Sequence, residues 1–283
     1  MNKLWIRPEE TLLPTFSTTS NSMRTDFTAF ERTVLATCAL LFLASAIVTV
    51  RLCASMPGGM QMPGGWRMSM VWMKMPDQSW VTAAASFTGM WVVMMMAMML
   101  PSLVPTLLSY RRSLQGMDVV HRVRLMGLAG AGYFLLWDVL GLAVYALGVT
   151  SVAAEMKWPL LARHVPFATA VVLLLAGCFQ LTSWKAGRLG KCRNAEACNP
   201  LVAPNSRNAF RQGLVWGADC VWCCMGFMAV LAVTGVMSLV AMIVVALGIT
   251  AERLLPRPDY TTRASGIVMI AAAAFAVAHA FGN

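Results

Sequence analysis

Charged residues are scarce in this sequence: Asp, Glu, Lys and Arg make up 12% of its 283 residues, whereas hydrophobic residues make up 58%. A soluble domain carries roughly 25% charged residues, so this composition argues against soluble domains. The apolar residues instead stand in seven blocks, each of about 20 residues, the length that crosses the hydrocarbon core of a bilayer. We therefore predict an all-α, polytopic transmembrane helix bundle surrounded by lipid.

Enzyme signatures are missing as well. The sequence has no phosphate-binding loop, no dinucleotide fingerprint, no nucleophile elbow and no paired-histidine zinc motif. The net charge of +10 would suit nucleic acid, but the basic residues stand between apolar blocks, where they set membrane orientation. We therefore predict no nucleic-acid partner, and no enzyme unless a cysteine pair works as a redox couple. We also expect no cleaved signal peptide, because residues 1–30 are polar.

Seven helices are predicted, at approximately 33–52, 80–103, 125–149, 166–184, 212–232, 236–254 and 265–281. They form one transmembrane domain, 30–283, after a polar segment, 1–29. With a cytoplasmic N-terminus, 17 Lys and Arg residues lie inside and 5 outside, as expected in a multi-pass protein of the bacterial inner membrane. The alternative is six helices, with the last on the membrane surface or the fifth and sixth forming one hairpin.

The outer connecting segment, 53–79, is rich in methionine and contains MPGG twice. Pro and Gly exclude a regular helix in its first half, so we expect a flexible loop. Clustered thioethers such as those of Met60 and Met62 are soft ligands that favour Cu(I). The alternative is a flexible apolar lip at the membrane surface.

The strongest chemical signal is a group of three cysteines in the fifth predicted helix: Cys220, Cys223 and Cys224. Positions i, i+3 and i+4 share one helix face, so we expect the three sulfurs to point the same way. With a fourth ligand they would bind a soft or borderline metal ion, copper or zinc. The alternative is packing by small side chains, because free Cys is commonly buried. Gly213 and Gly217 predict close packing of this helix.

Other cysteines are candidates for the missing ligand. Cys178, in the fourth predicted helix, is expected at a depth similar to that of Cys220. The inner connecting segment, 187–211, is basic and holds Cys192 and Cys198. Their spacing is not a standard zinc motif, so they become ligands only if the segment folds back toward the cysteine-bearing helix. Otherwise they are ordinary loop thiols.

Two carboxylates and several methionines are accessory candidates. Asp219 precedes the cysteines and Asp138 lies in the third predicted helix. Ionisable groups inside a membrane are costly and mark functional sites. Met95 and Met98 belong to a run of five methionines in six residues. The structural alternatives are a hydrogen bond to a neighbouring helix for Asp219 and gap-filling in the core for the methionines.

Several blocks of the sequence match one family pattern. They are AMMLPSLVPTLLSY at 97–110, Gly132 to Trp137, FQLTSWK at 179–185, Gly217 to Met228 with CVWCCMGFM, GVMSLVAM, and the ending Ala251-Glu252-Arg253. Through these blocks, roughly 91–256, the chain resembles a bacterial family of predicted metal-binding integral membrane proteins (domain-of-unknown-function family 2182). The resemblance implies a helical membrane protein that binds metal.

The chain departs from that family at one position. After the lysine that ends FQLTSWK, the family usually has two cysteines four residues apart. Here the first of these positions is Arg188 and the second is Cys192. One ligand implied by the resemblance is therefore missing. Cys198 is a candidate replacement; otherwise this member binds metal differently or not at all.

Three functions fit these observations. The leading prediction is a metal-binding membrane protein that handles copper or zinc through its cysteine cluster, for transport or for delivery to a partner such as a metallochaperone. A membrane thiol-disulfide oxidoreductase would use the CxxC pair Cys220 and Cys223, although thiols facing the cytoplasm argue against disulfide chemistry. A structural subunit of a larger membrane complex would use the methionine-rich faces for packing.

Overall fold

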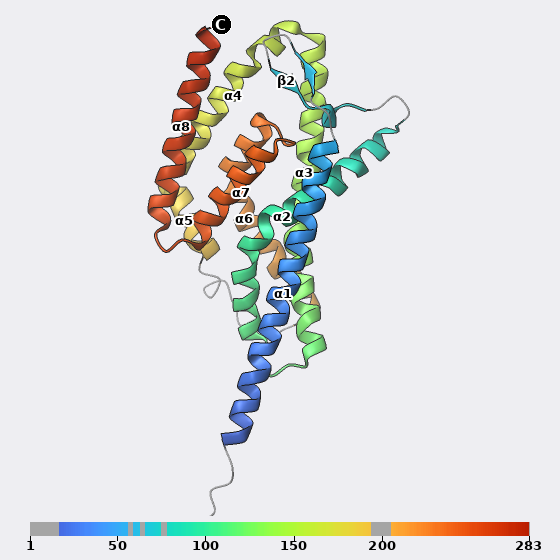
Figure 1. The fold of residues 1–283 in the computed structure, drawn as a ribbon, viewed down its shortest axis with the longest axis vertical. Helices are drawn as coiled ribbons and strands as arrows, with labels where there is room; N and C mark the ends of the chain where they lie inside the picture. Colours follow the sequence, from blue (N-terminus) through green and yellow to red (C-terminus); the bar gives the residue numbers. More distant parts are fainter. Residues whose placement is uncertain (1–16, 56–58, 63–65, 75–77, 194–204, 283) are drawn as a thin grey trace, which may run out of the picture. The chain divides into compact units, whose positions relative to one another are not determined.

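The computed structural model describes residues 17–55, 59–62, 66–74, 78–193 and 205–282, and Figure 1 shows its helices. The elements are α1 (Ser17–Ser55), β1 (Met60–Gln61), β2 (Arg67–Met68), the 3-10 helix η1 (Met70–Trp72), α2 (Trp80–Ser113), α3 (Val119–Lys157), α4 (Pro159–Gln180), α5 (Ser183–Arg193), α6 (Ser206–Thr234), α7 (Leu239–Leu254) and α8 (Pro258–Gly282). The chain divides into two compact units, Met1–Leu40 and Leu41–Asn283. The described part of the first unit is the beginning of α1, which starts within the segment predicted to be polar and separate.

Six described helices are long and apolar enough to cross a membrane: α1, α2, α3, α4, α6 and α8. The predicted all-α polytopic fold is confirmed, and the chain is a multi-pass membrane protein. Each of the seven predicted blocks is helical. The sixth block, α7, has 16 residues and so spans about 24 Å, less than the hydrocarbon thickness of about 30 Å. The short helix is therefore α7, whereas the six-helix alternative placed the last helix on the membrane surface or joined the fifth and sixth in one hairpin.

The sequence prediction missed α5. The fourth predicted helix continued to residue 184, but α4 ends at Gln180 and a new helix begins at Ser183. Thr182 causes the break, because its hydroxyl donates to the Phe179 carbonyl at 2.7 Å and accepts from the Lys185 amide at 3.3 Å. Threonine is a favoured residue at a helix start. The segment 187–211, predicted as a loop, therefore contains the second half of α5 and the start of α6.

The segment 53–79 also differs from the flexible loop that its composition predicted. Its first three residues complete α1, and β1 pairs with β2 in an antiparallel two-stranded sheet with Met60 opposite Met68. The indole of Trp66 donates a hydrogen bond to the carbonyl of Ala162 in α4 at 2.9 Å. The described part of this segment is therefore anchored to the helix bundle.

Helices α3 and α6 pack closely through glycine, as the sequence predicted. A Cβ atom on Gly213 would lie 1.9 Å from the carbonyl oxygen of Ala129, and one on Gly217 would lie 3.0 Å from that of Tyr133. Small residues let two helix backbones approach in this way. The approach brings the Tyr133 side chain to Cys220, one turn beyond Gly217 on α6.

Candidate metal centre

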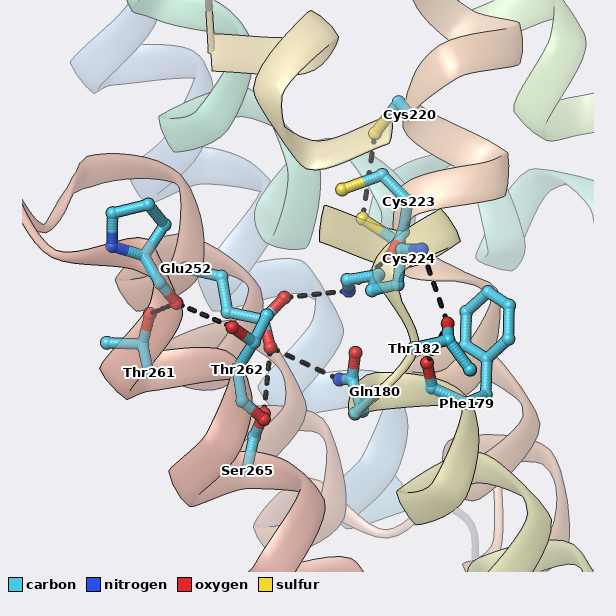
Figure 2. A network of polar contacts seen from close by, with 12 residues as sticks. Phe179, Gln180, Thr182, Cys220, Cys223, Cys224, Glu252, Thr261, Thr262 and Ser265 are labelled. Carbon is cyan, nitrogen blue, oxygen red and sulfur yellow. Dashed lines mark hydrogen bonds and ion pairs between the residues drawn. The ribbon is translucent and has the colours of Figure 1, made fainter. Parts of the chain in front are cut away.

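The three cysteines of α6 face the interior of the bundle. Cys220, Cys223 and Cys224 are at most 1% exposed, and Figure 2 shows their sulfurs on one side of the helix. The Sγ atoms of Cys220 and Cys224 lie 3.8 Å apart. All three cysteines are free thiols. One turn of α6 therefore carries three buried thiols on one side.

The separation of two sulfurs already suits a shared metal ion. Two thiolates bound tetrahedrally to one Zn²⁺ ion at about 2.3 Å each stand about 3.8 Å apart, which matches the distance between Cys220 and Cys224. Within the described residues, no group of three or more His, Cys, Asp or Glu side chains stands ready around a metal position. A further sulfur would have to turn toward that position on binding.

A fourth thiol reaches the group from α5. Cys192 is half-buried and forms a thiol–thiol hydrogen bond with Cys223, which together with burial raises the pKa of Cys192. Cys223 also interacts with the thiol of Cys224. The structure therefore brings together four of the six predicted cysteine ligands: Cys192, Cys220, Cys223 and Cys224. We call these four residues the cysteine centre.

Two polar side chains accompany the cysteine centre. The hydroxyl of Tyr133 donates a hydrogen bond to the sulfur of Cys220 at 2.9 Å. The Arg253 guanidinium interacts electrostatically with Cys220, Cys224 and Cys192. It also donates to the carbonyl of Ser102 on α2 at 3.2 Å, while its Nε is buried without a hydrogen-bond partner. A fixed positive charge beside thiols stabilises their anionic form.

A buried ion pair holds the helices around this turn of α6. Lys185 Nζ lies 2.8 Å from the Glu252 carboxylate and donates to the backbone carbonyl of Cys223 at 2.6 Å. Gln180 and Ser265 donate to the other carboxylate oxygen at 3.2 and 2.8 Å, as Figure 2 shows. Both ionised side chains are at most 3% exposed. This network connects α4, α5, α6, α7 and α8 at the cysteine centre.

Comparison with known families places the chain in one family. Residues 88–276, two thirds of the chain, match the model of the PpoB2 family, described as copper chaperone. The chain belongs to the PpoB2 copper chaperone family. No curated protein and no solved structure matches the chain. The matched region runs through α2–α8 and includes the whole cysteine centre. Family membership therefore agrees with the metal-related part of the sequence resemblance, and the description of the family mentions copper.

In this copper chaperone homologue an ion pair stands where the sequence resemblance expected a cysteine. The Arg188 guanidinium lies 3.5 Å from the carboxylate of Asp219 and over the ring of Trp184, 5.0 Å from its centroid. Arg188 and Asp219 are 33% and 18% exposed, so the pair lies at the edge of the bundle. Asp219 therefore joins α5 to α6, which corresponds to the structural alternative considered for it.

The remaining predicted site residues lie in different surroundings. Cys178 is exposed on α4. Its position along the helix predicted its depth in the membrane but not the direction of its side chain. Cys198 lies outside the described residues. Asp138 has one buried carboxylate oxygen without a hydrogen-bond partner. Two methionine candidates, Met95 and Met98, are buried on α2. The other two, Met60 and Met62, lie in the segment 53–79.

Sequence reasoning missed Tyr133, Arg253 and Lys185 as parts of the site. Tyr133 follows Gly132, where α3 contacts α6, but adjacent residues of a helix point in different directions, so no pattern in the sequence indicated that Tyr133 meets Cys220. Arg253 and Lys185 were assigned to cytoplasmic ends of helices. Their burial depends on the packing of α5 and α7, which no local pattern encodes.

Proposed function

We propose that the protein binds Cu(I) as cargo at the cysteine centre and delivers it to a partner protein at the bacterial inner membrane. The observation that carries the proposal is the gathering of four thiols beside one guanidinium, in a member of a copper chaperone family. Thiolates are the soft ligands that Cu(I) prefers.

Charge balance favours Cu(I) over Zn²⁺. A Cu(I) ion held by two thiolates forms a group with one negative charge, which the Arg253 guanidinium neutralises. A Zn²⁺ ion held by four thiolates would have two negative charges and leave one of them uncompensated in the bundle. Uncompensated buried charge is costly. Binding at two thiols releases two protons, because the ligands must be deprotonated.

Cys192 is the residue best suited to exchange copper with a partner. It is half-buried, whereas the three cysteines of α6 are buried. An incoming sulfur ligand can therefore reach it first and displace it from the ion. One thiolate replaces another in each step, so copper stays in the Cu(I) state and no oxidant is needed. The recipient or donor should present sulfur ligands of its own.

The main test is removal of the α6 thiols. The variant with Cys220→Ser, Cys223→Ser and Cys224→Ser, purified in detergent and loaded anaerobically with Cu(I), should lose the copper that survives desalting in the wild-type protein. Elemental mass spectrometry gives the copper-to-protein ratio. Cys178→Ser is the matched control, because this thiol is exposed, and it should keep wild-type copper. Equal copper in the triple variant and the control would overturn the proposal.

A thiol–disulfide oxidoreductase is the second candidate. The sequence predicted Cys220 and Cys223 as its redox pair, whereas the sulfur that lies 3.8 Å from that of Cys220 belongs to Cys224. Trapping with a maleimide reagent in intact cells separates the two functions. A redox couple should be oxidised in a fraction of the molecules. A copper site should give only free thiols once the metal has been chelated.

A further inference from the structure

A second group of sulfur side chains surrounds a small cavity between other helices. The cavity has a volume of about 10 Å³. Its lining comes from the end of α1, from α2, from the connection between α6 and α7, and from α7; the residues are Thr49, Leu52, Cys53, Met90, Met94, Met237 and Met242. Five of these seven residues contain sulfur. Four separate segments of the chain therefore bring residues with thioethers and one thiol to the lining of a single cavity.

The lining is better suited to a soft cation than to water. A volume of about 10–15 Å³ holds one water-sized sphere, and a buried water needs two to four polar partners. The only hydroxyl in the lining belongs to Thr49, and it already donates to the carbonyl of Ser45 at 2.8 Å. No carboxylate or imidazole lines the cavity, so hard and borderline ions lack their usual ligands. Thioethers and a thiol are ligands for Cu(I).

We infer that this methionine cavity is a second Cu(I) site, through which the cargo passes on its way to or from the cysteine centre. The identity of the cargo rests on the proposed function, whereas the ligands are separate from the four cysteines. Thioethers are neutral and the thiolates of the cysteine centre are anionic. The cavity should therefore hold Cu(I) more weakly and surrender it to the cysteine centre.

A row of methionines connects the two sites along α2. Met90, Met94 and Met98 follow one another at intervals of four residues and are 8%, 1% and 3% exposed. Residues four apart lie on one helix face about 6 Å from each other along the axis. The next position in the row is Ser102, whose carbonyl accepts the hydrogen bond from Arg253. The row therefore leads from the cavity to the guanidinium of the cysteine centre.

The test counts copper ions in four proteins loaded anaerobically with Cu(I) in detergent. Met94→Leu with Met242→Leu removes two thioethers while conserving volume, and should bind one ion fewer than wild type. Met156→Leu with Met225→Leu is the matched control, because both methionines are exposed. The Cys220, Cys223 and Cys224 triple serine variant should also lose one ion, and the combination of the two sets should retain none.

The outcomes distinguish this inference from the proposed function. If the Met94/Met242 variant binds as much copper as its methionine control, the second site is wrong, whereas loss in the triple serine variant still supports the cysteine centre. A melting temperature of the Met94/Met242 variant equal to that of its methionine control, measured in detergent, shows that this protein is folded. Cys53→Ser with Met90→Leu removes two other residues of the lining and should likewise bind one ion fewer than wild type.

Discussion

The two sulfur groups of this protein are built in opposite ways. The cysteine centre takes three of its four thiols from one turn of α6 and has the guanidinium of the half-buried Arg253 beside it. The methionine cavity takes seven residues from four segments and has no charged side chain in its lining. Charge is therefore the main difference. Under the proposed function, thiolates with a countercharge should hold Cu(I) more tightly than neutral thioethers, so each group would suit a different step of delivery.

The largest expected effect comes from breaking the buried ion pair between Lys185 and Glu252, which lies beside the cysteine centre. Lys185→Met leaves the Glu252 carboxylate buried without its cation, which typically costs about 3–5 kcal/mol. It also removes the hydrogen bond to the Cys223 carbonyl. We expect a strongly lowered melting temperature in detergent, measured by differential scanning fluorimetry, together with loss of copper from the cysteine centre.

Two further variants serve as controls for the effect of Lys185→Met on the melting temperature. Lys191→Met removes an exposed lysine from the same helix and should melt like wild type. Lys185→Met with Glu252→Gln removes both charges and should recover much of the lost stability, since neutral replacement of a buried pair is often tolerated. If Lys185→Met melts at the wild-type temperature, the pair does not hold the cysteine centre together.

A smaller effect is expected from Arg253, and it should be confined to one group. Arg253→Met removes the countercharge of the copper–thiolate group and should weaken Cu(I) binding there at least tenfold, or about 1.4 kcal/mol. Arg253→Lys keeps a charge without the planar guanidinium and should recover part of the affinity. Competition with a chromophoric Cu(I) chelator measures both variants.

The Arg253→Met substitution should leave Cu(I) binding at the methionine cavity unchanged. Affinity at the methionine cavity, measured in the triple serine background, should be the same with Arg253 or Met at this position. Arg257→Met is the control for loss of a basic residue, because Arg257 is exposed just after α7. Equal affinity of the Arg253→Met protein and this control would remove charge as the explanation of the difference between the groups.

The two sulfur groups also differ in how well the sequence predicted them. The cysteine cluster was predictable, because the spacing of Cys220, Cys223 and Cys224 fixes a common helix face. The methionine cavity was not, because its ligands meet only after four segments pack, and a run of methionines on α2 equally predicts core. Hydrophobic blocks gave every long helix. The break at Thr182 was missed because it depends on two hydrogen bonds inside an otherwise continuous pattern.

The smallest expected effect tests whether the cysteine centre is tuned by single hydrogen bonds. Tyr133→Phe removes the hydroxyl that donates to Cys220 at 2.9 Å and keeps the ring that packs edge-on against Phe134. A hydrogen bond donated to a thiolate sulfur stabilises the form of the cysteine that binds copper. Loss of this bond costs about 1 kcal/mol of binding free energy. Cu(I) affinity at the cysteine centre should therefore fall about fivefold, as measured by chelator competition.

Tyr145→Phe provides the matched comparison for this variant. Tyr145 is a buried tyrosine of the same helix, and it packs against Phe87, with ring centroids 4.9 Å apart. Its hydroxyl is not part of the cysteine centre, so Cu(I) affinity should match wild type at both groups. An equal fall in Tyr133→Phe and Tyr145→Phe would mean that α3 acts through packing alone. A fall in Tyr133→Phe only, with the methionine cavity unchanged, would show that the donor hydrogen bond belongs to the thiolate chemistry that separates the two groups.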